Sequence, residues 1–283
     1  MTLKKIIALF VFLNFSCHSQ DLKVLADLPS ILKEASGAQK TMGSDLIWMI
    51  NDAGNPPIVY GTDLKGKIVK SLKINAENND WEELTTDDKG NLYIGDFGNN
   101  NNKRTDLVIL KIKKEDLEST VPIVTEKISF HYPDQDKFPP KKKKKYFDCE
   151  AFFFFNDSLY LFTKSRVDNK HGKTNMYKIP SKSGCHEALK IDTYNTSCNK
   201  ITCWTTSADI SPDKSKVALL TPEALIIFTD FENDEFFNGK MKEYPFEFIT
   251  QKESVCFKDN DTVYITDEYT FGIGGNLYEL ELK

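Results

Sequence analysis

The sequence predicts an all-β fold, a five-bladed β-propeller closed by an N-terminal strand, from three observations. A short phrase recurs in which an acidic or hydroxyl residue stands about ten positions ahead of an apolar strand, as at Glu82, Glu150, Ser207 and Glu253. The copies repeat at roughly 50 residues, a period typical of propeller blades. Runs of Val, Ile, Thr, Tyr and Phe dominate the chain, and such runs favour strands.

Divided into units of four strands, the chain contains four complete blades and one incomplete blade. The expected strands are 34–37, 46–50, 58–60 and 68–72 for blade one; the strand from Glu82, 92–94, 107–110 and 127–130 for blade two; the strand from Glu150, 159–162, 175–179 and 188–191 for blade three; and 201–210, 217–220, 225–228 and 243–246 for blade four. Blade five has 254–257, 263–265 and 277–280, and residues 22–25 can supply the strand that it lacks. A strand from the N-terminus closes the ring and removes exposed edges. Six blades would result if residues 132–147 hid another, but that segment is rich in Pro and Lys and has no strand pattern.

The first residues have the layout of an export signal. Lys4 and Lys5 precede an apolar stretch at 6–13, and Cys17 follows a small residue. The stretch is too short to span a membrane. Residues 13–17 resemble a bacterial lipoprotein cleavage box, which implies a signal peptide at 1–16, a lipidated Cys17 and a single domain at 21–283. The other interpretation is an ordinary secretory signal with an incidental cysteine. The lipoprotein interpretation places the protein in the cell envelope, at the outer membrane or periplasmic face, held to the membrane only by its lipid.

Charge and cysteine content limit the partners. The formal net charge is −5, so nothing favours a nucleic-acid polymer, and we expect a monomer. The five lysines at 141–145 are either a solvated loop or a contact for anionic lipid or a phosphorylated ligand. Cys149 and Cys256 lie in repeat strands and should pack as small apolar residues, whereas Cys185 and Cys198 bracket one strand and are a candidate disulfide.

Residues that repeat at the start of each inner strand would form a ring around the propeller axis. The aligned positions are Glu34, Glu82, Glu150, Ser207 and Glu253. Neighbouring carboxylates repel one another unless a cation lies among them, and calcium takes about six to eight oxygen ligands. The ring therefore predicts an axial Ca²⁺. The other interpretation is that these glutamates pair with basic residues or cap backbone amides between blades. Glu83 is an alternative ring member, and Glu82 is chosen because residues 80–82 match residues 148–150.

Five blades with Glu, Glu, Glu, Ser and Glu in chain order resemble the soluble calcium-activated nucleotidases, or apyrases. That resemblance covers the propeller layout and five positions, and it implies a five-bladed propeller with an axial calcium. The remaining nucleotide-binding residues of that family are not found in this sequence. Residues 48–56 and 92–100 are similar to phrases in a group of uncharacterised bacterial exported propellers. This second resemblance spans most of the chain and implies no particular activity.

A second polar layer follows the second strand of the blades. The candidate ligand-binding residues are Asp52, Asp96, Arg104, Thr163, Lys164, Arg166, Asp267 and Glu268. Asp with Gly and Asn nearby is also ordinary turn chemistry. Acids beside cations are able to bind or hydrolyse a phosphorylated or sugar ligand. No nucleophile elbow and no zinc-binding helix motif is present in the sequence.

Three functional hypotheses follow from these patterns. The first is an envelope lipoprotein that binds Ca²⁺ on the propeller axis and a small polar or phosphorylated ligand at one mouth. The second is a Ca²⁺-dependent hydrolase of phosphate esters or nucleotides, with acids such as Asp96 and Asp267 near the metal. The third is a scaffold for another envelope protein. A deep polar mouth favours the first two, whereas a flat apolar mouth favours the third.

Overall fold

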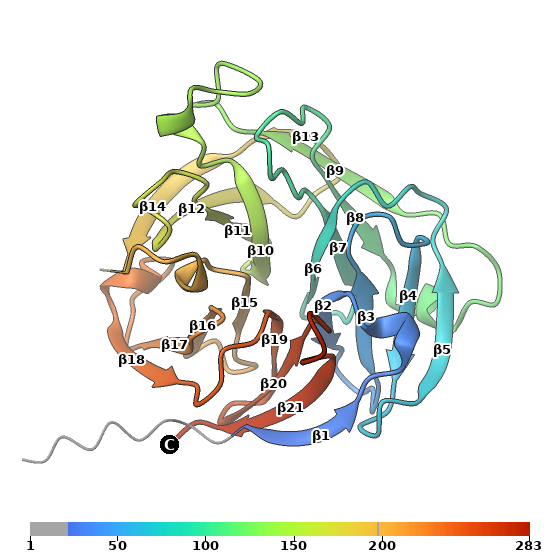
Figure 1. Ribbon diagram of the computed structural model, residues 1–283. Helices are drawn as coiled ribbons and strands as arrows, with labels where there is room; N and C mark the ends of the chain where they lie inside the picture. The colour runs from blue at the N-terminus through green and yellow to red at the C-terminus, as the bar shows by residue number, and fades with distance from the viewer. Residues whose placement is uncertain (1–21, 197) are drawn as a thin grey trace, which may run out of the picture.

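The computed structural model describes residues 22–196 and 198–283, and within them the chain forms five blades around a central axis (Figure 1). The predicted signal peptide and Cys17 lie outside the described residues. The count of five blades is confirmed, because residues 132–147 contain only a short 3₁₀ helix, η3 (Lys142–Lys144), and no strand. No helix among the described residues is long and apolar enough to cross a membrane.

Each blade is an antiparallel sheet whose first strand lies nearest the axis. Blade one contains β2 (Ala35–Lys40), β3 (Ile47–Asn51), β4 (Ile58–Thr62) and β5 (Ile68–Lys73). Blade two contains β6 (Trp81–Thr86), β7 (Leu92–Asp96), β8 (Val108–Ile112) and β9 (Glu126–His131). Blade three contains β10 (Asp148–Phe155), β11 (Ser158–Lys164), β12 (Lys173–Pro180) and β14 (Leu189–Asn195). Blade four contains β15 (Ser207–Ile210), β16 (Lys216–Leu220), β17 (Ala224–Thr229) and β18 (Lys240–Pro245).

Blade five is closed by the N-terminal strand, as predicted. It contains β19 (Lys252–Asp259), β20 (Thr262–Asp267), β21 (Asn276–Glu281) and β1 (Lys23–Asp27). β1 pairs antiparallel with β21, so that Val24 faces Tyr278 and Ala26 faces Leu277. The two ends of the chain therefore share one sheet, and the ring has no open seam.

Three details differ from the sequence-based expectation. The strand β13 (Gly184–Glu187) leaves blade three and adds in parallel to β9, which fastens two neighbouring blades. Blade four begins with the 3₁₀ helix η4 (Ile201–Cys203), and its inner strand starts only at Ser207. The disulfide joins Cys198 to Cys203, whereas Cys185 is free and exposed, so the pairing considered for Cys185 is wrong. Three further 3₁₀ helices occupy connections: η1 (Ser30–Leu32), η2 (Lys114–Glu118) and η5 (Phe236–Asn238).

The core is divided among five apolar clusters, each between two neighbouring blades. Aromatic rings fill the wide space between blades two and three, where Phe97 packs edge-on against Phe152. Cys149 and Cys256 are fully buried in two of these clusters, as expected for small apolar residues. Because the apolar packing lies between blades, the channel on the axis is free to hold polar side chains.

Candidate functional site

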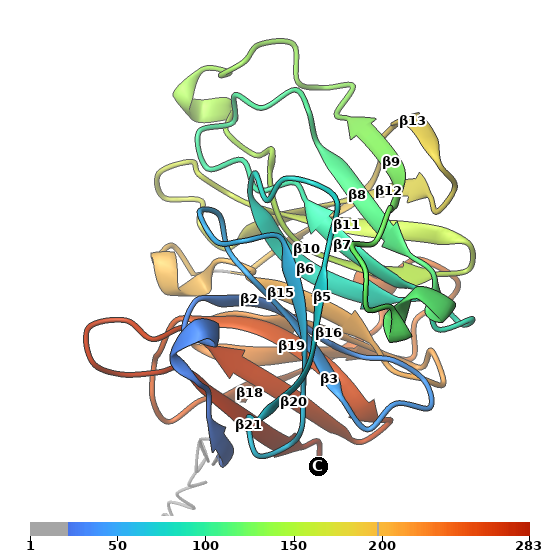
Figure 2. The same cartoon turned by 90° about the vertical axis from the view of Figure 1, so that its right-hand side faces the viewer.

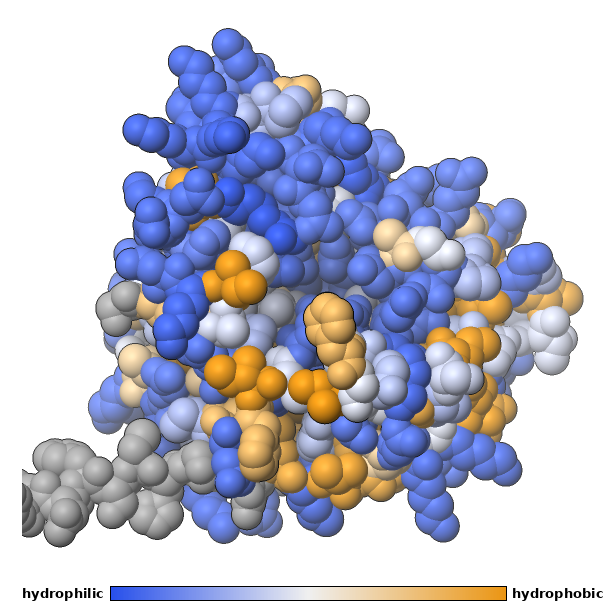
Figure 3. Space-filling model, viewed as in Figure 1, coloured by the Kyte–Doolittle hydropathy of each residue, from blue (hydrophilic) through white to orange (hydrophobic). Residues whose placement is uncertain are grey.

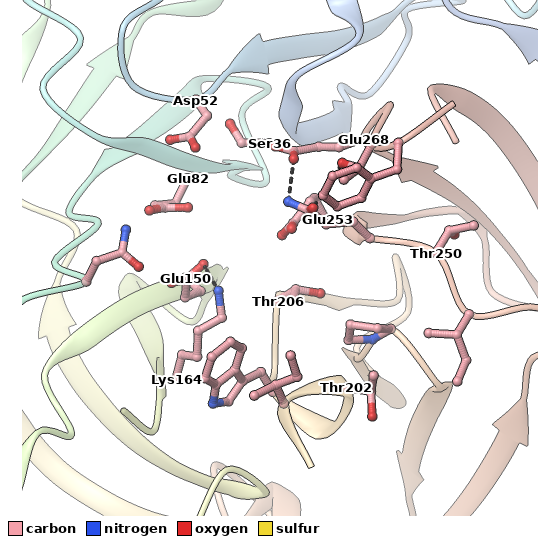
Figure 4. Close-up of a pocket in the computed structure, with 18 of the residues that line it drawn as sticks. Ser36, Asp52, Glu82, Glu150, Lys164, Thr202, Thr206, Thr250, Glu253 and Glu268 are labelled. Carbon is pink, nitrogen blue, oxygen red and sulfur yellow. Dashed lines mark hydrogen bonds and ion pairs between the residues drawn. The ribbon is translucent and has the colours of Figure 1, made fainter. Parts of the chain in front are cut away.

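A bulge near the start of four of the five inner strands turns one side chain toward the same mouth of the channel. The pairing of β2, β6, β10 and β19 with the next strand skips one residue each, and the skipped residues are Ser36, Glu82, Glu150 and Glu253. In blade four the equivalent residue is Thr206, which immediately precedes β15 and donates its backbone N–H to Leu220. A bulge re-aims a side chain that would otherwise follow the strand alternation. The five residues form the mouth ring, and all five line one pocket of about 530 Å³ (Figure 4).

The mouth ring differs from the expected ring at two positions. Glu34 lies two residues before the bulge, is exposed, and accepts a hydrogen bond of 2.7 Å from Asn55 at the rim. Ser207 lies one residue after Thr206, at the start of β15, and its hydroxyl donates to Glu83 in the channel below the mouth. The structure therefore does not bring Glu34 and Ser207 into the ring. Ser36 and Thr206 stand there instead, and their hydroxyls donate to backbone carbonyls of the next inner strand at 2.8 and 2.7 Å.

Strand alternation divides the second polar layer into residues that reach the pocket and residues that do not. Asp52, Lys164, Arg166 and Glu268 line the pocket. Asp96 and Asp267 end β7 and β20 opposite the residue before the bulge, and their side chains point away from the mouth. Successive side chains on a strand face opposite sides of the sheet, so one of two adjacent polar residues reaches the pocket and the other does not.

The residues that miss the pocket hold its loops in place. Asp96 accepts from Arg104 at 2.9 Å and from the backbone N–H of Asp80 at 3.1 Å. Asp267 accepts from the backbone N–H of Asn276 and the hydroxyl of Tyr278, both at 2.8 Å. Thr163 accepts from the backbone of Asn175 at 3.4 Å. Asp96, Arg104, Thr163 and Asp267 are therefore structural residues beside the site rather than part of its surface.

One side of the mouth carries a cluster of three carboxylates, and we call Asp52, Asp80 and Glu82 the acidic half. Carboxylate oxygens of these three residues all lie within 4.8 Å of one another. None of the three forms an ion pair within residues 22–196 and 198–283. Glu82 is only 8% exposed, and its carboxylate has no hydrogen-bond partner in the described part of the chain.

Space for these carboxylates depends on Gly98. A Cβ at Gly98 would overlap the carboxylates of both Glu82 and Asp80, although the backbone there does not need a glycine conformation. The backbone N–H of Gly98 also donates to the carbonyl of Asp80 at 3.1 Å. The glycine therefore leaves room for the two acids to converge, and a larger residue would push them apart.

The environment of the acidic half favours the protonated form of its carboxyl groups. Burial, and then the nearby Asp52 carboxylate, raise the pKa of Asp80 to about 7. Burial also raises the pKa of Glu82 well above its usual value, and neighbouring carboxylates, Glu150 first, raise it further. Across the pocket, burial and then Glu253 raise the pKa of Glu268 to about 8. Carboxyl groups in this condition will exchange a proton for a metal cation.

The opposite side of the mouth is neutralised by ion pairs, and we call Asp148, Glu150, Lys164 and Arg166 the paired half. Lys164 Nζ lies 2.8 Å from Glu150 Oε2, and Arg166 Nη2 lies 3.2 Å from Glu150 Oε1. Arg166 also pairs with Asp148 through its Nε atom. Burial opposes the charge on Lys164, but Glu150 outweighs it and holds the pKa of Lys164 above its usual value. Both cations thus stay charged beside the pocket.

Trp204 supports the two cations and was missed by the sequence analysis. The centre of its ring lies 4.6 Å from Arg166 Cζ and 5.3 Å from Lys164 Nζ, within the range of cation–π contacts. Its indole N–H donates to the carbonyl of Ser165 at 2.6 Å, which fixes the ring. Trp204 directly follows η4 and the Cys198–Cys203 disulfide, so this loop carries an aromatic wall into the pocket.

One of three similar solved structures, a sugar dehydrogenase, supports the fold with a TM-score above 0.5. The PQQ-bound aldose sugar dehydrogenase from Streptomyces coelicolor is 10% identical, with a TM-score of 0.52 over 92% of this chain and 98% of that one. A gluconolactonase from Xanthomonas campestris is 8% identical, with a TM-score of 0.48 over 95% and 96%. A virginiamycin B lyase from Staphylococcus aureus is 13% identical, with a TM-score of 0.42 over 90% of this chain and 69% of that one.

No protein-family model matches the chain, and no curated protein is similar to it in sequence. The fold and the site together define the class of protein as a five-bladed β-propeller with a carboxylate-lined mouth.

Proposed function

We propose that the mouth binds a divalent cation through Asp52, Asp80 and Glu82, and that Lys164 and Arg166 receive an anionic group of a small ligand. The observation that carries the proposal is the convergence of three carboxylates without a positive partner. Calcium lies about 2.3–2.6 Å from its oxygen ligands, so two ligands of one ion are at most about 5 Å apart. Oxygens that lie within 4.8 Å of one another satisfy this limit.

Calcium suits the donor set better than a transition metal. Every donor in the acidic half is a carboxylate oxygen, and histidine and cysteine are absent from this group. Three carboxylates leave several coordination positions for water or for oxygens of a ligand. A phosphate or carboxylate in the pocket would touch the cation on one side and Lys164 or Arg166 on the other, since Asp52 and Glu82 line the same hollow as the two basic residues (Figure 4).

Export belongs to the same proposal and rests on the sequence alone. The order of Lys4, Lys5, the apolar stretch and Cys17 supports a lipid-anchored envelope protein. Cys17→Ser should move the protein from the membrane fraction to the soluble fraction of the producing bacterium. A variant that stays with the membranes to the same extent would contradict the lipid anchor.

The cation is tested by calcium titration with thermal unfolding and calorimetry as the two measurements. At a hundredfold excess over Kd, calcium should stabilise the protein by about 2.7 kcal/mol. Glu82→Gln keeps the shape of the side chain but removes a ligand charge, so it should abolish most of this effect. Glu243→Gln, on the exposed outer strand β18, is the matched control and should respond like the wild type. A melting temperature that is the same in calcium and in chelator would rule out the site.

A second function is favoured by the ionisation of Glu268. A carboxyl with a pKa of about 8 in the same pocket as the proposed cation site can take or give a proton near neutral pH. This supports a Ca²⁺-dependent hydrolase of phosphate esters or nucleotides. A phosphatase and nucleotidase screen with and without calcium tests it. Glu268→Gln should then abolish turnover while calcium binding persists, whereas a screen without calcium-dependent turnover leaves ligand binding as the function.

A further inference from the structure

Large apolar side chains gather on one edge of the mouth, and we call Phe248, Ile249, Tyr269, Phe271 and Ile273 the apolar rim. They come from two loops: the β18–β19 loop, which joins blade four to blade five, and the β20–β21 loop of blade five. All five are more than half exposed, and Phe271 is fully exposed at the loop tip. Figure 3 shows apolar groups gathered beside the hollow on this face, whereas most of the remaining surface is hydrophilic. Such clusters mark interaction surfaces on soluble domains.

The two loops are held so that the apolar rim stays exposed. The buried Lys252 donates from Nζ to the carbonyl of Phe248 and to the hydroxyl of Thr250, both at 2.9 Å. The backbone N–H of Tyr269 donates to the carbonyl of Lys33 at 2.8 Å. Thr270 and Ile273 bridge across the turn that carries Phe271. The apolar rim is therefore a fixed feature of the surface, and Lys252 is a positioning residue for it.

The first described residues of the chain lie beside the apolar rim. A second cavity of about 680 Å³ is lined by Leu22 and Val24 together with Phe248, Tyr269 and Ile273. Cys17 stands five residues before Leu22, a distance that an extended chain spans with about 17 Å. A lipid on Cys17 would thus keep this edge of the molecule within reach of the membrane surface.

Basic residues stand on the same side of the molecule as the apolar rim. In the side view, the connection that contains η3 and the β20–β21 loop both project toward the left-hand side, on which the mouth opens (Figure 2). The connection contains the lysine run at 141–145, of which 141–144 are exposed. The backbone N–H of Arg166 donates to the carbonyl of Lys145 at 2.9 Å, which ties the run to the mouth. Lysines on a surface that also carries apolar groups suit anionic lipid headgroups.

We propose that this face docks onto a lipid bilayer. The apolar rim enters the headgroup region, the lysine run contacts anionic headgroups, and the mouth opens toward the membrane surface. The inference does not need the cation site, although a cation there would reduce repulsion between the acidic half and anionic lipid. It also gives the lysine run a role that the mouth alone does not provide.

Vesicle sedimentation tests the proposal with the mature chain carrying Cys17→Ser, which has no lipid of its own. The chain is mixed with vesicles of phosphatidylcholine alone or of phosphatidylcholine with phosphatidylglycerol. The chain should bind, and more strongly when phosphatidylglycerol is present. Phe271→Ser with Ile273→Ser should lower partitioning by about tenfold on both vesicle types, because apolar area drives insertion. Val124→Ser, an equally exposed valine before β9, is the control and should not change it.

Two further measurements separate the bilayer from other occupants. Lys142→Glu with Lys143→Glu should weaken binding only to the anionic vesicles. The tryptophan fluorescence of the Phe271→Trp variant should be quenched when the vesicles contain brominated lipid. The proposal is overturned if the chain binds neither vesicle type, or if the serine variant binds as well as the wild type. It is also overturned if light scattering shows that the chain is a dimer and that the variant with Phe271→Ser and Ile273→Ser is a monomer. The apolar rim would then be an interface between two copies.

Discussion

Glu82 and Glu150 occupy the same bulge position in neighbouring blades, yet their surroundings give them different properties. Glu150 is held by Lys164 and Arg166, whereas Glu82 lies beside Asp52 and Asp80 and has no positive partner among the described residues. The repeated backbone thus brings the side chain at this position to the same mouth in each blade, and in blades two, three and five that side chain is a carboxylate. The residues around that position then determine whether the carboxylate forms ion pairs within the fold, as Glu150 does, or lacks a positive partner, as Glu82 does.

The difference has an energetic meaning. A buried carboxylate without a partner costs free energy, which the molecule lowers by taking up a proton or binding a cation. A buried carboxylate that is paired with two cations leaves them uncompensated when it is removed. The two halves should therefore respond in opposite ways to the same substitution, and each prediction below acts on one side of this comparison.

The largest effect is expected on stability in the absence of calcium. Glu150→Gln leaves Lys164 and Arg166 short of one negative charge and should lower the free energy of unfolding by about 3 kcal/mol. Glu82→Gln replaces a buried carboxyl that has no positive partner among the described residues, so it should leave stability unchanged or raise it. Urea unfolding in chelator measures both. Equal losses in the two variants would show that the two halves do not differ in the way described.

The next effect is a dependence on pH. Burial, reinforced by neighbouring carboxylates, raises the pKa of Asp80 from 3.8 to about 7 and that of Glu268 from 4.5 to about 8. Between these ordinary and raised values the folded protein holds protons that the unfolded chain has released. Stability contributed by these groups is therefore lost as the pH rises from about 4 to about 8.

Calcium should reverse this loss, because it replaces the protons of the acidic half. The gap between melting temperatures in calcium and in chelator should thus widen from about pH 5 to about pH 8.5. Asp80→Asn should flatten the curve measured in chelator. A gap of constant size across this range would mean that no proton is exchanged for the cation.

The fold could be predicted because it follows from repeated local patterns. The apolar strands recur with the blade period, and the absence of a fourth strand in blade five pointed to residues 22–25, where β1 is found. The mouth ring was predicted at Glu82, Glu150 and Glu253. It was misplaced at Glu34 and Ser207 in the other two blades because the alignment followed residue type, whereas the pairing register with the next strand decides which residue reaches the mouth. If residues 34–36 are aligned with residues 80–82, so that the acidic and then the apolar residue of each segment match, Ser36 falls on the ring position.

The prediction of the second polar layer placed several residues in the pocket that do not reach it, and the reason is different. A list of polar residues after a strand ignores the alternation of side chains, so it joined Asp52 and Glu268, which reach the pocket, with Asp96 and Asp267, which do not. Counting from the bulge would have separated them. Asp80 and Trp204 come from connections, where no strand period applies, and tertiary contacts alone bring them to the mouth.

A smaller effect is expected at Gly54 and Gly98, which occupy the same place in two similar segments, residues 52–55 and residues 96–99. Gly54 has a φ of +85° and no atom within 4 Å of a hypothetical Cβ, so Gly54→Ala should cost about 1 kcal/mol of stability without altering calcium binding. Gly98→Ala would push Glu82 and Asp80 apart and should weaken calcium binding. Calorimetry and urea unfolding on both variants give the comparison. Equal calcium affinities would show that the acids do not need the space at Gly98.

The smallest effect is expected at Glu83, the residue next to Glu82. Its carboxyl is fully buried one layer below the mouth, where Ser207 donates to it and the backbone N–H of Leu84 donates at 2.8 Å. Burial raises its pKa well above the usual value, which favours the neutral, protonated carboxyl. Glutamine has the same shape and is also neutral. Glu83→Gln should therefore change the free energy of unfolding by less than about 1 kcal/mol. Its response to calcium should equal that of the wild type. If Glu83→Gln lost the response as Glu82→Gln should, the cation would lie deeper on the axis, between the mouth ring and the layer of Ser207. The acidic half would then be its entrance and not its site.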